Sequence, residues 1–323
     1  RKNIWKSSTL GLLGFCIPML IGTFSSIYIL EFSTATSILL ASMFASHTLI
    51  TYPIVSKLGL AKNKAVNIAV GSTLITNILA LLVLAIIVGM SNGSLSSFFW
   101  IKLVLSFTAS TLIILLVFPH IARWFFKRFR DNVSQYIFVL VIVFSGAILS
   151  QLAGIEGIIG AFMAGLALNG LIPRHSPLMN RIDFVGNAIF IPFFLIGVGM
   201  LIDYRAFTNK HTLFVAFIMT AVAILGKYLA AIITRRSFKL TSDEGTLIFG
   251  LTNSQAAATL AAVLVGYNII LGYNDAGLPI RLLNHEILNG TIIMILVTCT
   301  VASFATQRAS HRIASSDQLL NQP

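Results

Sequence analysis

The sequence predicts an all-α polytopic membrane protein with about ten transmembrane helices. Of its 323 residues, 57% are hydrophobic and only 10% are charged, whereas roughly a quarter of the residues of a soluble domain are charged. Long apolar stretches recur along the chain, and each is long enough to cross a hydrocarbon core about 30 Å thick as a helix. Lys and Arg also gather in alternate loops between these stretches. The lipid bilayer is therefore the predicted environment of the chain.

The predicted spans follow one another through short polar loops. Their approximate bounds are residues 8–30, 34–56, 64–90, 95–118, 133–152, 155–171, 185–202, 210–234, 245–271 and 284–306. We expect one transmembrane domain over residues 1–306, followed by a polar, solvated cytoplasmic tail over residues 307–323.

The basic residues predict the orientation of the spans, because cytoplasmic loops carry the excess of Lys and Arg. One set of loops holds 17 of them and the other set holds three. The first set is Arg1, Lys2, Lys6, Lys57, Lys62, Lys64, Arg123, Lys127, Arg128, Arg130, Arg174, Arg181, Arg235, Arg236, Lys239, Arg308 and Arg312, and the second is Arg205, Lys210 and Arg281. Both termini are thus expected in the cytoplasm, with the chain in a bacterial inner membrane. Topology also explains the net charge of +12, so we expect no nucleic-acid partner.

Two predicted spans carry polar residues near their middle, where a lipid-facing helix should have none. The side chains are Ser46, His47, Thr48 and Thr51 in span 34–56, and Asn253, Ser254 and Gln255 in span 245–271. Pro53 also removes a backbone donor from the first span, and hydroxyl and amide side chains can satisfy backbone groups that unwinding frees. Both spans are therefore predicted to be broken helices.

The two broken spans occupy matching places in two blocks of three spans that run through the membrane in opposite senses. Interrupted helices at matching positions of an inverted repeat indicate a transport site near the midplane. For either span alone, back-bonding of Ser and Thr with a kink at Pro53 is the simpler explanation. The pair together favours a site.

Three further polar residues lie inside predicted spans. Lys227 is well inside span 210–234, where a charge is costly and usually marks a pathway or a partner; the alternative is a lysine that snorkels to the interface. Thr76 and Asn77 lie in the middle of span 64–90. An Asn carbonyl oxygen can bind a hard cation but cannot exchange a proton near neutral pH; the alternative is an inter-helix hydrogen bond. His47 can titrate near physiological pH, or it packs as a hydrogen-bonded core residue.

These segments resemble the membrane part of the monovalent cation:proton antiporters of the second, Kef-type family, the sodium/hydrogen exchanger membrane domain. The resemblance runs through nearly the whole chain, and its strength lies in the order and spacing of several short pieces. The pieces are Ser42–Pro53 (SMFASHTLITYP), Ala69–Ala85 (AVGSTLITNILALLVLA), Gly160–Leu166 (GAFMAGL), Ile191–Asp203 (IPFFLIGVGMLID), Gly226–Ala230 (GKYLA) and Gly250–Gly266 (GLTNSQAAATLAAVLVG).

The resemblance implies an inverted-repeat antiporter fold with two crossed broken helices. It also implies a homodimer, with a six-helix core over residues 8–90 and 210–306 that moves against intervening helices in 95–202. Members have about thirteen helices, so we expect some three helices upstream of this chain. The implied ion site contains Thr76, Asn77 and Lys227, completed by the broken helices.

The chain departs from the family pattern at Asn77. The family usually has an aspartate there, which binds cation and proton in competition, and Lys227 matches the lysine that pairs with the ion-site residues. Three explanations are open: an engineered neutralisation, a natural inactive or altered homologue, or proton transfer by Lys227 or His47.

The leading expectation is a secondary active transporter that exchanges Na+ or K+ for H+, and that is inactive if Asn77 leaves it without a proton carrier. The alternatives are a non-transporting regulatory or scaffold homologue and a cation channel or uniporter. The sequence holds no spaced His, Cys or carboxylate cluster, nucleophile elbow or phosphate loop, so we expect no enzyme and no cofactor.

Overall fold

The computed structural model describes residues 4–91, 97–153, 157–173, 176–200, 208–274 and 277–320. Across these ranges the chain is almost entirely helical, with one two-stranded sheet, which confirms the predicted class. The chain divides into two compact units, residues 1–84 with 202–323, and residues 85–201. Four basic residues used in the charge count lie outside the described residues, namely Arg1, Lys2, Arg174 and Arg205.

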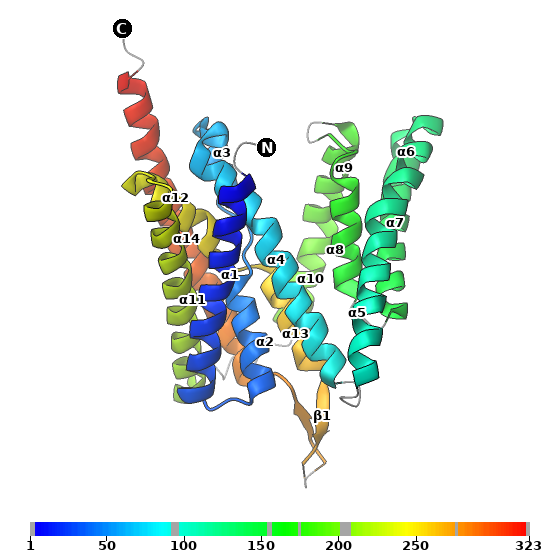
Figure 1. Cartoon of the computed structure of the whole chain (residues 1–323), viewed down its shortest axis with the longest axis vertical. Helices are drawn as coiled ribbons and strands as arrows, with labels where there is room; N and C mark the ends of the chain where they lie inside the picture. The colour runs from blue at the N-terminus through cyan, green and yellow to red at the C-terminus, as the bar shows by residue number, and fades with distance from the viewer. Residues whose placement is uncertain are drawn as a thin grey trace. The chain divides into compact units, whose positions relative to one another are not determined.

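The first unit is a bundle in which α1 packs against α2 and α11, and α14 packs against α11 and α12. The broken helix α2–α3 runs in the opposite direction to the broken helix α12–α13 (Figure 1), as the inverted repeat predicts. The elements are α1 (Ile4–Tyr28), α2 (Thr34–Ala45), α3 (Tyr52–Lys57), the 3-10 turn η1 (Leu60–Lys62), α4 (Lys64–Ser91), α11 (Lys210–Ser237), α12 (Ser242–Asn253), α13 (Ala257–Asn268), β1 (Ile270–Tyr273), β2 (Pro279–Arg281) and α14 (His285–Leu320).

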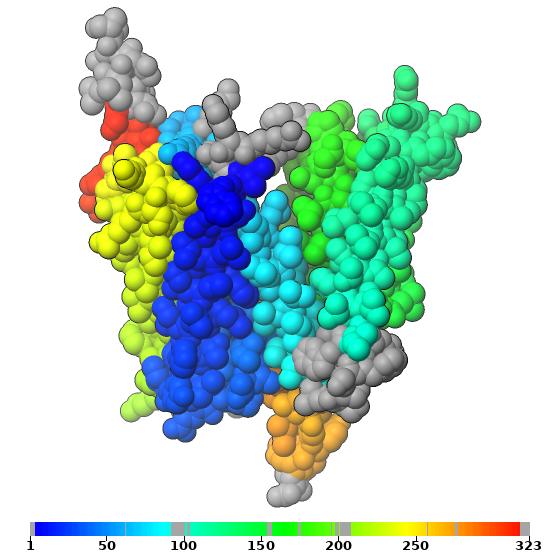
Figure 2. Space-filling view, viewed as in Figure 1, coloured from blue at the N-terminus to red at the C-terminus, as the bar shows by residue number. Residues whose placement is uncertain are grey.

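Helix α1 forms an exposed face of the first unit, drawn in dark blue in Figure 2. Trp5, Leu12, Leu20 and Phe24 are 52–80% exposed on this helix, a degree of apolar exposure that water would penalise and a bilayer would not. The helix is therefore built for a hydrocarbon environment.

Two parts of the first unit differ from the sequence expectation. The chain after residue 306 is not simply a solvated tail, because α14 continues to Leu320 and buries Ala309, Ser310 and Ile313. The end of predicted span 245–271 lies in an antiparallel hairpin, in which Gly272 pairs with Ile280 and Tyr273 with Pro279. The sequence pattern predicts no strand there.

The second unit is a set of helices in which α7 packs against α8. A π-helical turn joins α5 to α6, so the predicted span 95–118 is part of a helical segment that runs to Arg128. The elements are α5 (Ser97–Leu112), η2 (Ile113–Val117), α6 (Phe118–Arg128), α7 (Asn132–Leu152), α8 (Gly157–Leu168), α9 (Pro177–Val185), the π-turn η3 (Gly186–Phe190) and α10 (Ile191–Gly199).

Asp131 caps the start of α7. The hydrogen bonds that its carboxyl group accepts from the backbone and side chain of Ser134 lower the pKa of that group.

Seven helical segments among the described residues are long and apolar enough to cross a membrane. They are Ile4–Tyr28, Lys64–Ser91, Val104–Arg128, Asn132–Leu152, Lys210–Ser237, Ser242–Asn268 and His285–Ser316. The other three predicted spans fall on the shorter helix pair α2–α3, on α8, and on the α9–α10 segment. The chain is an integral membrane protein, and the number of ten crossings stays a prediction.

Small residues set the distance between α7 and α8. A Cβ atom added to Gly146 would lie 2.7 Å from the Gly160 carbonyl oxygen, and one added to Gly160 would overlap the Gly146 carbonyl oxygen and the Ser150 hydroxyl. Backbones that approach this closely are typical of small-residue packing between membrane helices.

We therefore expect Gly160→Ala to push α7 away from α8 and to lower the melting temperature of the purified protein in detergent. The cost of such overpacking is about 1–3 kcal/mol. Gly165→Ala is the matched control, since it lies on the same helix and an added Cβ meets nothing within 4 Å. Equal melting temperatures for the two variants would contradict the close-packing account.

Candidate functional site

Both predicted helix interruptions are present. The first helix ends at Ala45, Ser46 takes an extended backbone conformation (φ −60°, ψ 154°), and helix resumes at Tyr52. The second ends at Asn253, Ser254 is extended (φ −71°, ψ 121°), and helix resumes at Ala257. Pro53 falls in the first turn of α3, where its missing N–H costs nothing. We call residues 46–51 the first break and residues 254–256 the second.

The two breaks contact each other through main-chain groups. The Thr48 N–H donates to the Ser254 carbonyl oxygen at 2.9 Å, and the Ser254 hydroxyl donates to the Thr48 carbonyl oxygen. The Thr51 hydroxyl donates to the Gly250 carbonyl oxygen in α12 at 3.3 Å. These bonds hold two segments about 200 positions apart in the sequence at one crossing.

The carbonyl groups at the end of α2 receive side-chain donors. The last carbonyls of any helix lack intrahelical partners, and a bilayer offers no water to satisfy them. The Lys227 ammonium donates to the Ala45 carbonyl oxygen, and the Gln255 amide donates to the Phe44 carbonyl oxygen at 3.0 Å. A cation at this end of α2 is also favoured by the helix dipole.

Lys227 reaches a second freed carbonyl in α1. Pro18 lies inside α1 and has no N–H for the carbonyl group four residues earlier, which is that of Gly14. The Lys227 Nζ atom donates to this Gly14 carbonyl oxygen at 3.2 Å. Gly226 permits the approach, because a Cβ there would lie 2.9 Å from the Pro18 Cα atom. Lys227 is 1% exposed, so the snorkelling interpretation is wrong.

His47 links Lys227 to α4. Its Nδ1 atom lies 3.3 Å from the Lys227 Nζ atom and 3.4 Å from the Thr76 hydroxyl, and its Nε2 atom lies 2.9 Å from the Thr73 hydroxyl. Asn77 bonds the His47 main chain twice, accepting from its N–H at 3.3 Å and donating to its carbonyl oxygen at 3.2 Å. Asn77 therefore does make an inter-helix hydrogen bond, and it makes it to a broken segment.

Polar groups of α14 support the second break. The Asn253 Nδ2 atom donates to the Thr298 carbonyl oxygen at 3.2 Å, and the Gln255 N–H donates to the Thr298 hydroxyl at 3.4 Å. The Thr259 hydroxyl donates to the Gln255 Oε1 atom at 2.6 Å. The Asn253 Oδ1 atom is buried and has no hydrogen-bond donor among the described residues. It is a buried acceptor atom without a donor in this part of the structure.

The structure brings the predicted site residues together, although their roles stay predictions. Thr76, Asn77 and Lys227 all contact His47, and Thr48 pairs with Ser254. Ser46 is buried at the end of α2, with its N–H bonded to the Ser42 carbonyl oxygen at 3.2 Å. Six contributors were not predicted from the sequence, namely Gly14, Pro18, Thr73, Thr259, Thr298 and Cys299, whose thiol donates to the Gln255 carbonyl oxygen. A proline inside an apolar span was a usable signal for the first two.

Known proteins that match the chain include sodium/hydrogen antiporters. The transmembrane sodium/hydrogen exchanger family matches residues 1–310 of the chain. The Na+/H+ antiporter NhaS5 of Synechocystis sp. is 37% identical over 316 residues, which cover 97% of this chain and 44% of that protein.

Two further relatives come from other organisms. A probable Na+/H+ antiporter of Methanocaldococcus jannaschii is 28% identical over 92% of this chain and 76% of its own length. A Na+/H+-K+ antiporter of Bacillus cereus is 24% identical over 93% of this chain and 74% of its own length. The chain thus spans less than half of the cyanobacterial relative and about three quarters of the other two.

The geometry predicts that Gln255→Met destabilises the protein more than the same change on the surface. The substitution leaves the Phe44 carbonyl and the Thr259 hydroxyl without this partner, and a buried polar group left unsatisfied costs about 1–3 kcal/mol. Gln135→Met is the control, because Gln135 also donates to a backbone carbonyl, that of Phe129 at 2.8 Å, but in an exposed position. Thermal unfolding in detergent gives the melting temperature of both variants. An equal decrease in the two melting temperatures would contradict a role of Gln255 in holding the second break.

Proposed function

Because the chain belongs to the transmembrane sodium/hydrogen exchanger family, we propose that it exchanges a monovalent cation, Na+ or K+, for H+ by alternating access. The observation that carries the proposal is the crossing of the two breaks beside buried Lys227. Half-helix ends that meet inside an inverted repeat offer partial charges and free carbonyl groups to ions.

The oxygen atoms around the breaks suit a monovalent cation. Hard cations take carbonyl, amide and hydroxyl oxygens, and the crossing supplies the Asn253 Oδ1 atom, the Thr76 hydroxyl and the Asn77 amide oxygen. Of these, the Asn253 Oδ1 atom accepts no hydrogen bond within the described part of the chain. It is the atom we assign first to the cation.

Asn77 cannot carry the proton, but its geometry is informative. An Asn amide has the shape of a protonated carboxylic acid, with its NH2 group in place of the hydroxyl group. The donation from Asn77 Nδ2 to the His47 carbonyl oxygen is one that an ionised carboxylate cannot make. Asn77 therefore holds the first break as a proton-loaded acid would.

We assign the proton to the Lys227 and His47 pair. Their nitrogen atoms lie 3.3 Å apart, so a charged Lys227 donates to an unprotonated Nδ1 atom, while Nε2 faces the Thr73 hydroxyl. No carboxylate of the described residues forms an ion pair with Lys227. Both groups are fully or almost fully buried, so any proton they exchange must follow an opening of the site.

A cation at the crossing and a charged Lys227 would repel each other. Two unit charges 4 Å apart repel by about 4 kcal/mol at an effective dielectric constant of 20, which corresponds to roughly a thousandfold change in affinity. This repulsion supplies the coupling that an aspartate would otherwise provide.

Orientation and assembly belong to the same proposal. The start of α1, the start of α12 and the end of α14 lie at one end of the first unit (Figure 1), and these segments carry Lys6, Arg308 and Arg312 of the basic loop set. We propose that this end faces the cytoplasm of a bacterial cell. A homodimer stays an expectation from the family resemblance.

The proposal predicts that Lys227→Met abolishes exchange. In proteoliposomes, a pH gradient should drive uptake of radioactive Na+ or K+ by the unmodified chain, and uptake by Lys227→Met should fall to that of empty vesicles, because the coupled proton is lost. Lys210→Met, a change in an exposed lysine at the start of the same helix, should leave uptake unchanged. Melting temperatures of all three proteins check their folding.

Asn77→Asp separates the proposal from its competitors. If only the Asp form exchanges, the chain is a neutralised antiporter and the proton assignment to Lys227 and His47 is wrong. Uptake that ignores the pH gradient would indicate a channel or uniporter. Absence of uptake by either form would favour a non-transporting homologue.

A further inference from the structure

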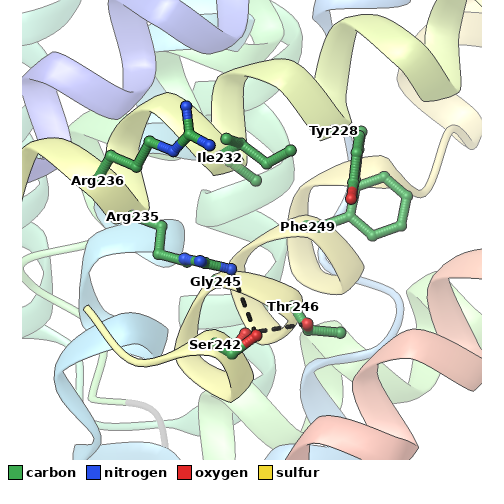
Figure 3. Close-up of a pocket in the computed structure, with 9 residues that line it drawn as sticks. Tyr228, Ile232, Arg235, Arg236, Ser242, Gly245, Thr246 and Phe249 are labelled. Atoms are coloured by element: carbon green, nitrogen blue, oxygen red, sulfur yellow. Dashed lines mark hydrogen bonds between the residues drawn. The ribbon is translucent and has the colours of Figure 1, made fainter. Parts of the chain in front are cut away.

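A second polar feature of the first unit lies at the end of α11, away from the breaks. It is a pocket of about 280 Å³ between α11 and the start of α12. Figure 3 shows Arg235 extending toward Ser242, while Tyr228 and Phe249 lie together on another side. The lining residues are Tyr228, Ala231, Ile232, Arg235, Arg236, Ser242, Gly245, Thr246 and Phe249. We call this the arginine pocket.

The arginine pocket holds positive charge without a matching carboxylate. Among the described residues, neither Arg235 nor Arg236 forms an ion pair. The two nearby acids of α12 are engaged elsewhere, Asp243 with Arg312 at 3.5 Å and Glu244 with the Thr241 N–H at 2.9 Å. An anion can therefore enter without displacing an internal partner.

Packing fixes Arg235 at the wall of the pocket. A Cβ atom added to Gly245 would lie 2.6 Å from the Arg235 Cδ atom, so the glycine leaves room for the arginine stem. The Arg235 Nη1 atom donates to the Ser242 hydroxyl at 3.3 Å. Arginine presents further N–H donors in a planar fork, the geometry that matches phosphate oxygens.

Tyr228, Ala231, Ile232 and Phe249 form an apolar part of the wall, which continues along an exposed apolar face of α11. Tyr228 is 50% exposed and its ring packs edge-on against Phe249. Leu225 and Phe217, 53% and 68% exposed, continue the same helix face at spacings of three to eight residues. A ligand with a charged head and a long apolar tail would meet both kinds of surface.

We propose that the arginine pocket binds an anionic membrane phospholipid, with its phosphate on Arg235 and Arg236 and an acyl chain along Ile232, Tyr228 and Leu225. Lys227 lies on the same helix and α12 leads to the second break, so the bound lipid would hold these two helices together at one end. This inference does not depend on the proposed exchange activity.

The test is native mass spectrometry of the full chain, delipidated in detergent and titrated with phosphatidylglycerol. We expect Arg235→Gln with Arg236→Gln to weaken binding of the first lipid by about tenfold or more, since each basic side chain near an anionic lipid contributes about 1 kcal/mol. Arg236→Gln alone, a change in an exposed side chain, should give an intermediate loss and guards against misfolding of the double variant.

The matched control removes the same charge elsewhere. Arg123→Gln with Arg130→Gln changes two exposed arginines of the basic loop set in the other unit and should leave the affinity unchanged. Phosphatidylcholine and millimolar inorganic phosphate should not displace the lipid. Equal losses of lipid affinity in both double variants would show that the lipid binds through diffuse surface charge and not through the pocket. Displacement of the lipid by inorganic phosphate would show that the pocket is a site for the free ion. Either result overturns the proposal.

Discussion

The contact of the Lys227 ammonium with two freed carbonyl groups is the interaction on which the crossing depends. One carbonyl belongs to Ala45 at the end of α2, and the other to Gly14, which Pro18 deprives of its usual donor. A carbonyl left without a partner in a bilayer costs several kcal/mol, so a helix can stop inside the membrane only where another helix brings a donor. Gln255 serves the Phe44 carbonyl in the same way.

This solution to a folding problem also sets up the chemistry. In the proposed function, the cation takes the Asn253, Thr76 and Asn77 oxygens at the same crossing, and the charge of the ammonium group opposes a second positive charge there. His47 accepts at one side of Lys227, and Asn77 fixes the His47 main chain through both of its amide atoms. In our account the coupling thus rests on an ammonium group, where a carboxylate would otherwise serve.

Much of the site was predictable because its residues violate the rules for lipid-exposed helices. The polar run at His47 and the buried charge of Lys227 are each costly unless a partner exists, and Pro53 favours the start of a new helix, so the sequence alone marks these positions. The partners themselves were harder to predict, since nothing local relates Gly14 to Lys227 or Thr298 to Gln255. The hairpin after α13 was not predicted, because a strand of only four residues that contains Gly272 and lies close to Gly277 has the composition of a loop. The extension of α14 was not predicted, because most residues after residue 306 are polar. The signal for a helix was the spacing of four residues between the two apolar positions Ala309 and Ile313, which are buried and lie on one helix face.

The protonation of Lys227 tests this account most directly. Selective 15N labelling of lysine, with the resonance assigned through Lys227→Arg, would report the Nζ atom by solid-state NMR in lipid vesicles at fixed pH. The account predicts that saturating Na+ or K+ converts the resonance from ammonium to amine, while a large cation such as choline does not. A resonance that remains ammonium in saturating Na+ and in saturating K+ would contradict it, because the proton would then not be exchanged at this residue.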